Sequence, residues 1–371
     1  MSRTPILVWA TCVGLIAVAP AVVGEGALRF ATECLLILSM AQMWNLLAGY
    51  GGLVSLGHQV FVALGAYGLF LSSGWLDVSP YWTLPVAPVI CAIVAAIIAL
   101  PLFRLREAYF SIAMWVFAEI VAAFTTKSSL MGGTAGVTLS TSRLLDFDWF
   151  EPILFWIAGS LALGLLGALY LLMKSSFGLG LMSVRDNDIA ATSVGVNVQR
   201  NRFIVFVLSA AGCGLAGAVS FLGNLYVGPA AAFDVNWVVY MMFIVLIGGI
   251  GTLEGPIVGM IVFFGLREIV TDQLGISAGW YLVMLGIVAV IVMLWSPRGL
   301  WPMLRDRFGI DLLSIRRLAP KNDAGVGRHA RDRDELPDRP RDEGRPGFAQ
   351  GERAGAARAA SCTGERAQSD L

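Results

Sequence analysis

The chain has 371 residues, of which 57% are hydrophobic and 14% charged, and its formal net charge is zero. Soluble proteins carry roughly a quarter charged residues, so this composition excludes an ordinary soluble protein. Of the 52 charged residues, 27 lie in 296–371, and several uncharged stretches before them reach the roughly 20 residues that cross a bilayer. The sequence therefore predicts an all-α fold, a polytopic transmembrane helical bundle.

About ten spans are expected, with Gly-interrupted helices among them. Their approximate bounds are 5–24, 28–48, 53–73, 81–103, 108–126, 151–173, 203–223, 237–249, 255–270 and 279–295. Lys and Arg favour short cytoplasmic loops, which sets the orientation. With the N-terminus inside, Arg3, Arg104, Arg106, Lys174, Arg185, Arg200, Arg202 and Arg298 are cytoplasmic, against Arg29, Lys127, Arg143 and Arg267 outside or near that edge. Both termini are therefore expected in the cytoplasm.

Two glycine-rich breaks share the pattern GG-x-x-[ST]-L. The first is 51–58, GGLVSLGH, and the second is 248–256, GGIGTLEGP. Interrupted hydrophobic segments in corresponding places of two halves point to a substrate path. The alternative is two tight turns of similar composition, and His58 in particular fits a hydrogen-bonded structural role. Candidate path residues near the breaks are Asn45, Ser55, His58, Gly248, Gly249 and Thr252.

Between the breaks, two further residues are candidates for the path. Glu119 lies near the middle of segment 108–126, where an ionisable group marks a functional position or a hydrogen bond between helices. Thr134 lies in the glycine-rich turn 131–137 of the external loop, which could line an entrance or receive a partner. Arg29 and Glu33, near the outer edge, are expected to form an ion pair with each other.

The polar interval 174–202 is predicted to hold a short cytoplasmic helix. Its carboxylate and amide side chains at 186–188 offer N-cap oxygens, 189–194 could form about two turns, and Gly195 suits a left-handed C-terminal residue. Small side chains at 190 and 191 leave a surface for another protein, and Gly178 and Gly180 make the start of the interval bendable. A plain connecting turn is the alternative. The candidate contact residues are Arg185, Asp186, Asn187, Asp188, Ala190, Ala191, Gly195 and Asn197.

The sequence divides into a transmembrane domain, 1–300, and a charged tail, 301–371. From about Lys321 the tail is rich in charged residues, Gly and Pro, so it is expected to be a disordered cytoplasmic segment. Its mixed charge signs argue against a nucleic-acid partner.

Several kinds of chemistry are not expected. A phosphate-binding G-x-x-x-x-G-K-[ST] loop needs a Gly-Lys pair, but Lys127, Lys174 and Lys321 follow Thr, Met and Pro. No catalytic constellation and no metal-site spacing of Cys occur either. We therefore predict a non-enzymatic chain without a cofactor or metal, for which any ATP-driven role requires a second polypeptide.

Five segments in order resemble the permeases of branched-chain amino acid ABC importers. They are NLLAGYGGLVSLGHQVFVALGAY, LFRLREAYFSIAMWVFAEIV, GGTAGV, GLGLMSVRDNDIAATSVGVNVQRNRFIVFVLSAAGCGLAGA and MMFIVLIGGIGTLEGPIVGMIVFFGLRE. Together they cover roughly Asn45 to Trp301. Within this family the chain resembles the second of two related permease subunits. It departs from the family in its long charged tail, and 185–197 differs from the more widespread coupling signature that opens with Glu-Ala-Ala.

The resemblance implies a bacterial inner-membrane permease for branched-chain amino acids. Its implied partners are a sister permease, two cytoplasmic ATP-binding subunits that dock on 174–202, an extracytoplasmic solute-binding protein, membrane lipid and the small-molecule solute. Related permeases carry urea or short amides, which is the alternative substrate class. An ion-coupled secondary transporter is the alternative from another class, and a membrane enzyme or sensor that acts through the tail is a third.

Overall fold

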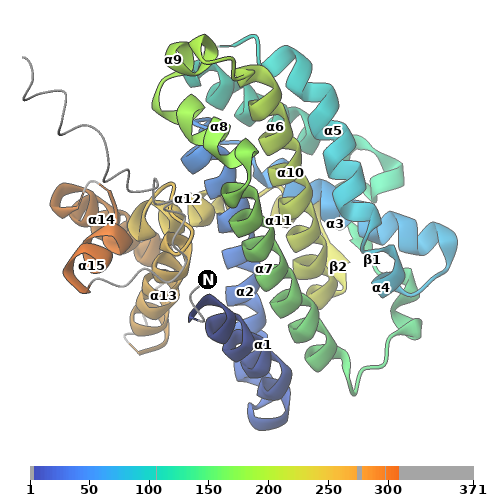
Figure 1. The fold of residues 1–371 in the computed structure, drawn as a ribbon. Coiled ribbons are helices and arrows are strands. Elements are labelled where there is room, and N and C mark those ends of the chain that lie inside the picture. The colour runs from blue at the N-terminus through green and yellow to red at the C-terminus, as the bar shows by residue number, and fades with distance from the viewer. Residues whose placement is uncertain (1–3, 106, 274–277, 297, 309–371) are drawn as a thin grey trace, which may run out of the picture. The chain divides into compact units, whose positions relative to one another are not determined.

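Helices form almost all of the computed structural model, which describes residues 4–105, 107–273, 278–296 and 298–308 (Figure 1). The α-helices are α1 Thr4–Val22, α2 Glu25–Asn45, α3 Gln59–Leu76, α4 Pro80–Thr83, α5 Val86–Leu102, α6 Glu107–Lys127, α7 Phe150–Lys174, α8 Ser176–Asp186, α9 Asp188–Ser193, α10 Val198–Asn224, α11 Pro229–Ala232, α12 Asn236–Gly248, α13 Gly255–Arg267, α14 Ala278–Trp295 and α15 Leu300–Phe308. Two π-helices, η1 Leu46–Tyr50 and η5 Glu268–Gln273, extend α2 and α13, and three 3₁₀ turns, η2 Ser129–Met131, η3 Gly133–Ala135 and η4 Ser140–Leu144, follow α6. A two-stranded antiparallel ribbon pairs β1 Val137–Thr138 with β2 Tyr226–Val227.

The prediction of a polytopic helical bundle is confirmed, but the prediction of ten spans is not. Seven helices in the described residues are long and apolar enough to cross a membrane, or eight if α14 and α15 form one bent span. Segment 255–270 gives the 13-residue α13 and the start of η5, and predicted segment 53–73 begins inside an irregular stretch, because α3 starts at Gln59. The exact number of spans therefore stays a prediction.

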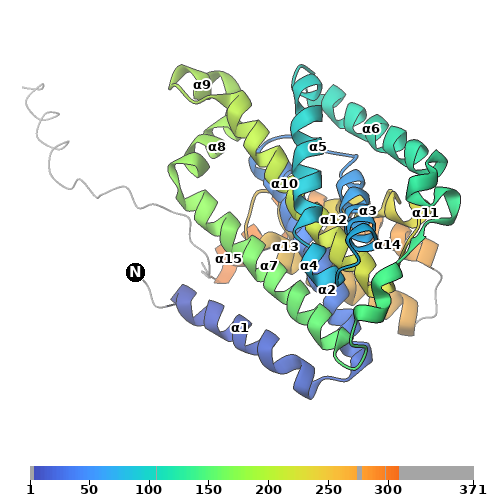
Figure 2. The ribbon, with the colours of Figure 1, turned by 90° about the vertical axis from the view of Figure 1, so that its right-hand side faces the viewer.

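Helix α10 forms the centre of the packing and contacts α2, α3, α5 and α7 (Figure 2). Its glycines explain how closely α5 and α3 approach, since Cys91 lies on α5 and Val62 on α3. A β-carbon on Gly214 would lie 2.9 Å from Cβ of Cys91, and one on Gly217 would lie 2.7 Å from Cα of Val62. Small residues let the helix backbones meet, which is how membrane helices pack when lipid supplies no hydrophobic drive.

Helices α12 and α13 form a tight antiparallel hairpin. A β-carbon on Gly259 would overlap the carbonyl oxygen of Ile244, so the two backbones touch. At the open end of the hairpin, Arg267 Nη1 lies 2.6 Å from Glu33 Oε1 in the first half of α2. At its tip, Gly251 lies against Gly49. The hairpin thus runs beside α2 and η1 from Glu33 to Gly49, 16 residues and about 24 Å at the α-helical rise.

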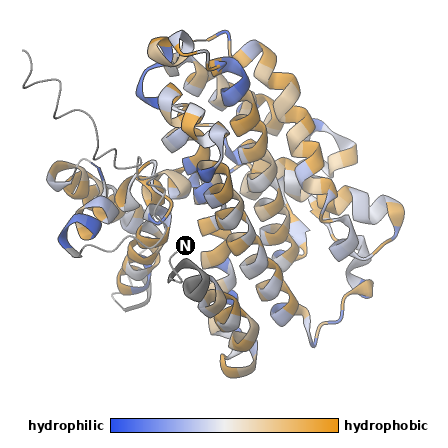
Figure 3. Ribbon diagram, in the orientation of Figure 1, coloured by the Kyte–Doolittle hydropathy of each residue, from blue (hydrophilic) through white to orange (hydrophobic). Residues whose placement is uncertain are grey.

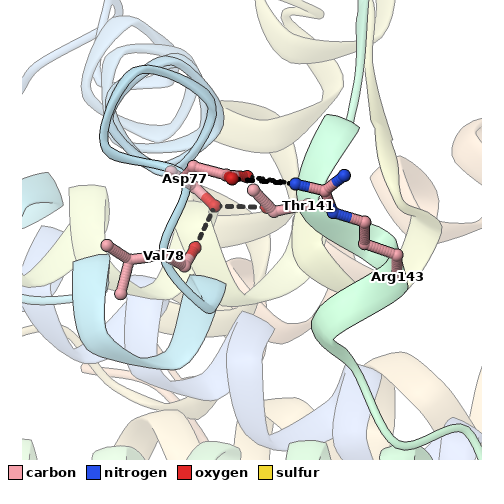
Figure 4. Close-up of polar contacts among 5 residues, drawn as sticks. Asp77, Val78, Thr141 and Arg143 are labelled. Atoms are coloured by element: carbon pink, nitrogen blue, oxygen red, sulfur yellow. Dashed lines mark hydrogen bonds and ion pairs between the residues drawn. The ribbon is translucent and has the colours of Figure 1, made fainter.

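Polar residues gather at the end of the bundle that holds α8 and α9, which we call the α9 end, and on α15 (Figure 3). The opposite end, which we call the ribbon end, holds β1 and β2. There, the loop after α6 is tied to the end of α3: Arg143 Nη2 lies 2.8 Å from both carboxylate oxygens of Asp77, and Ser73 hydrogen-bonds Thr141 (Figure 4).

Two sequence expectations differ in detail from the structure. Residues 301–308, the start of the predicted tail, belong to helix α15 (Leu300–Phe308), which packs against α13, whereas 309–371 lie outside the described residues. The expected ion pair of Arg29 with Glu33 does not form. Arg29 instead pairs with Glu151 of α7 at 2.9 Å, and Glu33 pairs with Arg267, because each α2 side chain faces a different neighbouring helix.

Candidate functional site

Helix α9 is the short capped helix that the sequence predicts at 174–202. Asn187 is the N-cap, and its Oδ1 accepts hydrogen bonds from the backbone N–H groups of Ile189 at 2.9 Å and Ala190 at 3.0 Å. The helix ends at a left-handed Gly195 with a φ of 84°. The N–H of Val196 returns to the carbonyl of Ala191 at 3.0 Å, which closes the C-terminus.

The side chains that α9 presents differ from those expected. Ala191, expected to face another protein, is 1% exposed and packs into its own chain, while Ala190 is exposed. The outward apolar side chains are Ile189, 81% exposed, and Val194, 77% exposed. Sequence analysis missed both. The sequence did carry a signal for them, because Ile189 and Val194 are apolar residues near the two ends of a short helix in an otherwise polar interval.

Ionic and amide contacts attach α9 to its neighbours. Asp188 Oδ2 lies 2.9 Å from Arg202 Nη2 on α10, and Asn197 Oδ1 caps α10 by accepting from the N–H of Arg200 at 2.9 Å. Asp186 and Asn187 are exposed at the junction of α8 and α9. The unit of α8, α9 and the first turn of α10 is therefore anchored by named bonds.

Helix α8 replaces the bendable stretch expected at Gly178 and Gly180. Both glycines lie inside the helix, whose N-cap is Ser175. Gly178 is needed for a close approach instead: a β-carbon there would lie 2.6 Å from the carbonyl oxygens of Leu172 and Met173 at the end of α7. The sharp turn from α7 into α8 uses this space.

At the first glycine-rich break, every candidate side chain is buried and bonded. His58 Nε2 lies 2.8 Å from Ser209 Oγ of α10, and its Nδ1 lies 3.1 Å from Ser55 Oγ. Because Ser209 donates its hydroxyl to the Met43 carbonyl at 2.7 Å, it accepts from His58, whose proton therefore sits on Nε2. The break is a hydrogen-bonded junction of α2, α3 and α10.

The second break forms the tip of the α12–α13 hairpin and packs against the residues that lead into the first break. Asn45 Nδ2 donates to the carbonyl of Thr252 at 2.8 Å, and its Oδ1 accepts from the N–H of Gly251 at 2.8 Å. Gly248 and Gly249 are buried beside them. A β-carbon on Gly49 would lie 2.8 Å from Cα of Gly251, so only glycines fit this crossing. The structure thus brings the second break against Asn45 and Gly49, which lie just before the first break.

Glu119 and Thr134 lie apart from this junction. Glu119 is exposed on α6, thirteen residues into a helix of 21, next to exposed Trp115 and Ile120. Thr134 is exposed in the loop that follows α6 at the ribbon end. In the described part of the chain, neither side chain is buried, whereas the junction residues Asn45, Ser55 and His58 are.

Within the described part of the chain, no group of three or more His, Cys, Asp and Glu side chains could hold a metal ion. Four buried polar side chains, however, have atoms without a hydrogen-bond partner: Gln42, Tyr50, Gln59 and Tyr67. They lie on α2, η1 and α3, around the first break. Buried groups of this kind are suited to receive water or a polar solute.

Comparisons with known proteins agree on one family. Residues 26–293 match the model of the branched-chain amino acid transport system permease component. The chain is 27% identical to the high-affinity branched-chain amino acid transport system permease protein LivM of Escherichia coli, over 78% of this chain and 73% of that protein. It is equally identical to LivM of Salmonella typhimurium, over 79% and 74%. It is 24% identical to the probable permease protein LivH of Methanocaldococcus jannaschii, over 70% and 84%. No solved structure matches.

Proposed function

Because this chain belongs to the permease component family of branched-chain amino acid transport systems, we propose that it is one permease subunit of an ATP-driven importer for these amino acids. Its sister permease would complete the translocation path, and two separate subunits would hydrolyse ATP. A solute-binding protein would deliver the amino acid at the ribbon end. This places the α9 end and both termini in the cytoplasm of a bacterial cell, with the chain in its inner membrane.

The observation that carries the proposal is helix α9. It is fixed by caps at both ends and by the Asp188–Arg202 ion pair, yet it exposes Ile189 and Val194 at the polar end of the molecule. An isolated helix of six residues would not form in water, so these bonds hold it ready for a partner. An apolar groove on an ATPase subunit is the complement of this surface.

The face of α6 around Glu119 is our candidate for the contact with the sister permease. A carboxylate at the centre of a lipid-facing helix is unfavourable by about 3 kcal/mol on insertion scales. A second protein that supplies a hydrogen-bond donor, or water in a path between the subunits, removes this penalty. Thr134 follows α6 and would lie at the outer mouth of the same path.

The junction of the two breaks is our candidate for the moving part of the path. It is closed in this structure, since Ser55 and His58 are 0% exposed. Transport would require Asn45, Ser55 and Thr252 to meet solute in another state of the same junction. Cysteines at positions 55 and 252 are therefore expected to react with small polar thiol reagents faster during ATP turnover than at rest. Equal, slow reaction in both conditions would contradict this role.

Reconstitution tests the function itself. Vesicles that contain this chain, its sister permease, the ATPase subunits and the binding protein should accumulate leucine only with ATP inside the compartment that the ATPases face. The same permease pair with an ion gradient and no ATPase should not. Accumulation under the second condition would identify an ion-coupled transporter, and ATP-driven uptake of urea without leucine would identify the other substrate class.

A further inference from the structure

Arg185 lies at the contact between the α8–α9 segment and the hairpin tip. It belongs to the last turn of α8, two residues before the Asn187 cap of α9. A β-carbon on Gly251 would overlap its Nη1 atom, so the guanidinium lies directly on the tip backbone, where only a hydrogen stands on Cα. Sequence analysis placed Arg185 among the contacts to the ATPase; in the structure Arg185 is exposed, and its guanidinium contacts the hairpin tip of its own chain.

The tip is suited to receive a cation at this place. Helix α12 ends at Gly248, and its final carbonyl groups carry the negative end of the helix dipole. Asn45 holds the N–H of Gly251 and the carbonyl of Thr252, so the tip backbone is presented in one orientation. On its other side, Gly249 packs against Gly299 at the start of α15. The tip is therefore clamped by three elements, of which α8 is the one that continues into α9.

We propose that Arg185 is a positioning residue that transmits movement of the docked α9 to the hairpin tip, and so to the junction of the two breaks. The proposal rests on the function proposed above. Displacement of α9 by an ATPase would move α8, because only Asn187 separates the two helices. The guanidinium then shifts against the tip while Asp188–Arg202 keeps α9 attached to α10.

The first test separates transmission from docking. In the complete reconstituted importer, Arg185→Ala should leave recovery of the ATPase subunits with the permease within twofold of the wild type. The number of leucine molecules imported per ATP hydrolysed should fall about tenfold, the usual size of a coupling between two sites. Arg200→Ala is the matched control, because Arg200 is an exposed cation at the same end, in the first turn of α10. It should change neither quantity.

Arg185→Lys keeps the positive charge and the helix, but it replaces the planar guanidinium and its fixed N–H donors with an ammonium group. It should give an intermediate transport ratio, and it decides the question if the Ala variant does not reach the membrane. Loss of ATPase recovery in proportion to uptake would overturn the proposal and assign Arg185 to the docking surface. An unchanged transport ratio in both variants would also overturn it. The wild-type vesicles show independently whether ATP-driven uptake occurs at all.

Discussion

At the scale of single residues, the contrast between Ile189 and Ala191 matters most. The two lie two positions apart on one short helix, yet Ile189 is exposed and Ala191 is buried. A surface apolar side chain adds little to the stability of its own fold, whereas a larger side chain at a packed position forces its neighbours apart. Their substitutions should therefore separate docking from folding.

Ile189→Asp is expected to reach the membrane at the wild-type level and to lose most of the ATPase on co-purification, because it puts an unpaired carboxylate into an apolar contact. Ala191→Trp should instead lower the yield of folded permease, since Ala191 is buried in its own chain and a much larger side chain must displace its neighbours. Both yields are measured by monodisperse recovery in detergent. Normal ATPase recovery with Ile189→Asp would show that α9 is not the docking helix.

Gly195 tests the backbone at the end of the same helix. Its φ is 84°, and a β-carbon there would have no atom within 4 Å, so a substitution acts through backbone strain alone. Gly195→Val should destabilise the end of α9 by about 1–2 kcal/mol, seen as faster hydrogen exchange of the Val194–Val196 amides. Gly195→Asn, which tolerates this conformation, is the control. Equal exchange in the two variants would contradict a strained left-handed position.

At the scale of elements, glycine contacts hold the two arms of the α12–α13 hairpin together and place its tip against η1. Gly49, Gly248 and Gly259 each face backbone atoms at distances that no β-carbon allows. Such contacts bring the carbonyl group of Thr252 and the N–H group of Gly251 within reach of Asn45. Relative motion of the hairpin tip and Asn45 must break the hydrogen bonds of Asn45 to Gly251 and Thr252.

Gly49→Ala should lower the apparent melting temperature of the purified permease and abolish uptake, because its β-carbon would lie 2.5 Å from the N of Gly251. Overpacking of this kind destabilises by about 1–3 kcal/mol. Gly286→Ala on α14, where a β-carbon would meet nothing within 4 Å, is the control and should be neutral. A neutral Gly49→Ala would mean that α2 and the hairpin separate readily.

At the scale of the whole molecule, the helices differ in how much of their surface this one chain covers. In the 18-residue stretch of each helix that is best suited to cross a membrane, 67% of α3 is buried, but only 22% of α6. Both are apolar, so hydrophobicity does not separate them. Because α6 carries Glu119, its exposed face needs contact with protein or water. An exposed face without an ionisable residue can contact lipid.

Glu119→Leu removes the carboxylate and is expected to reduce recovery of the sister permease by about tenfold, the effect of losing roughly 1.4 kcal/mol of association free energy. Glu119→Gln keeps hydrogen bonding and should retain more of it. Ile120→Leu, a volume-conserving change at the next residue, serves as the control. Wild-type recovery of the sister subunit and wild-type uptake with Glu119→Leu would remove α6 from both interface and path.

The sequence by itself determined the fold class, the family and the capped helix α9. Those depend on local information: long apolar stretches, ordered motifs, an N-cap amide at Asn187 and a glycine where a left-handed residue is required. Hydropathy could not show that α12 and α13 turn back on each other, because length and composition do not encode where a segment packs.

Only the tertiary structure decided which residues meet. It joined Asn45 to Gly251 and Thr252 across more than 200 positions, paired Arg29 and Glu33 with different helices, buried Ala191 and turned Arg185 towards the hairpin. These outcomes follow from how the helices are placed around α10. The direction of a side chain depends on that placement, and the residues adjacent to it in sequence do not fix it.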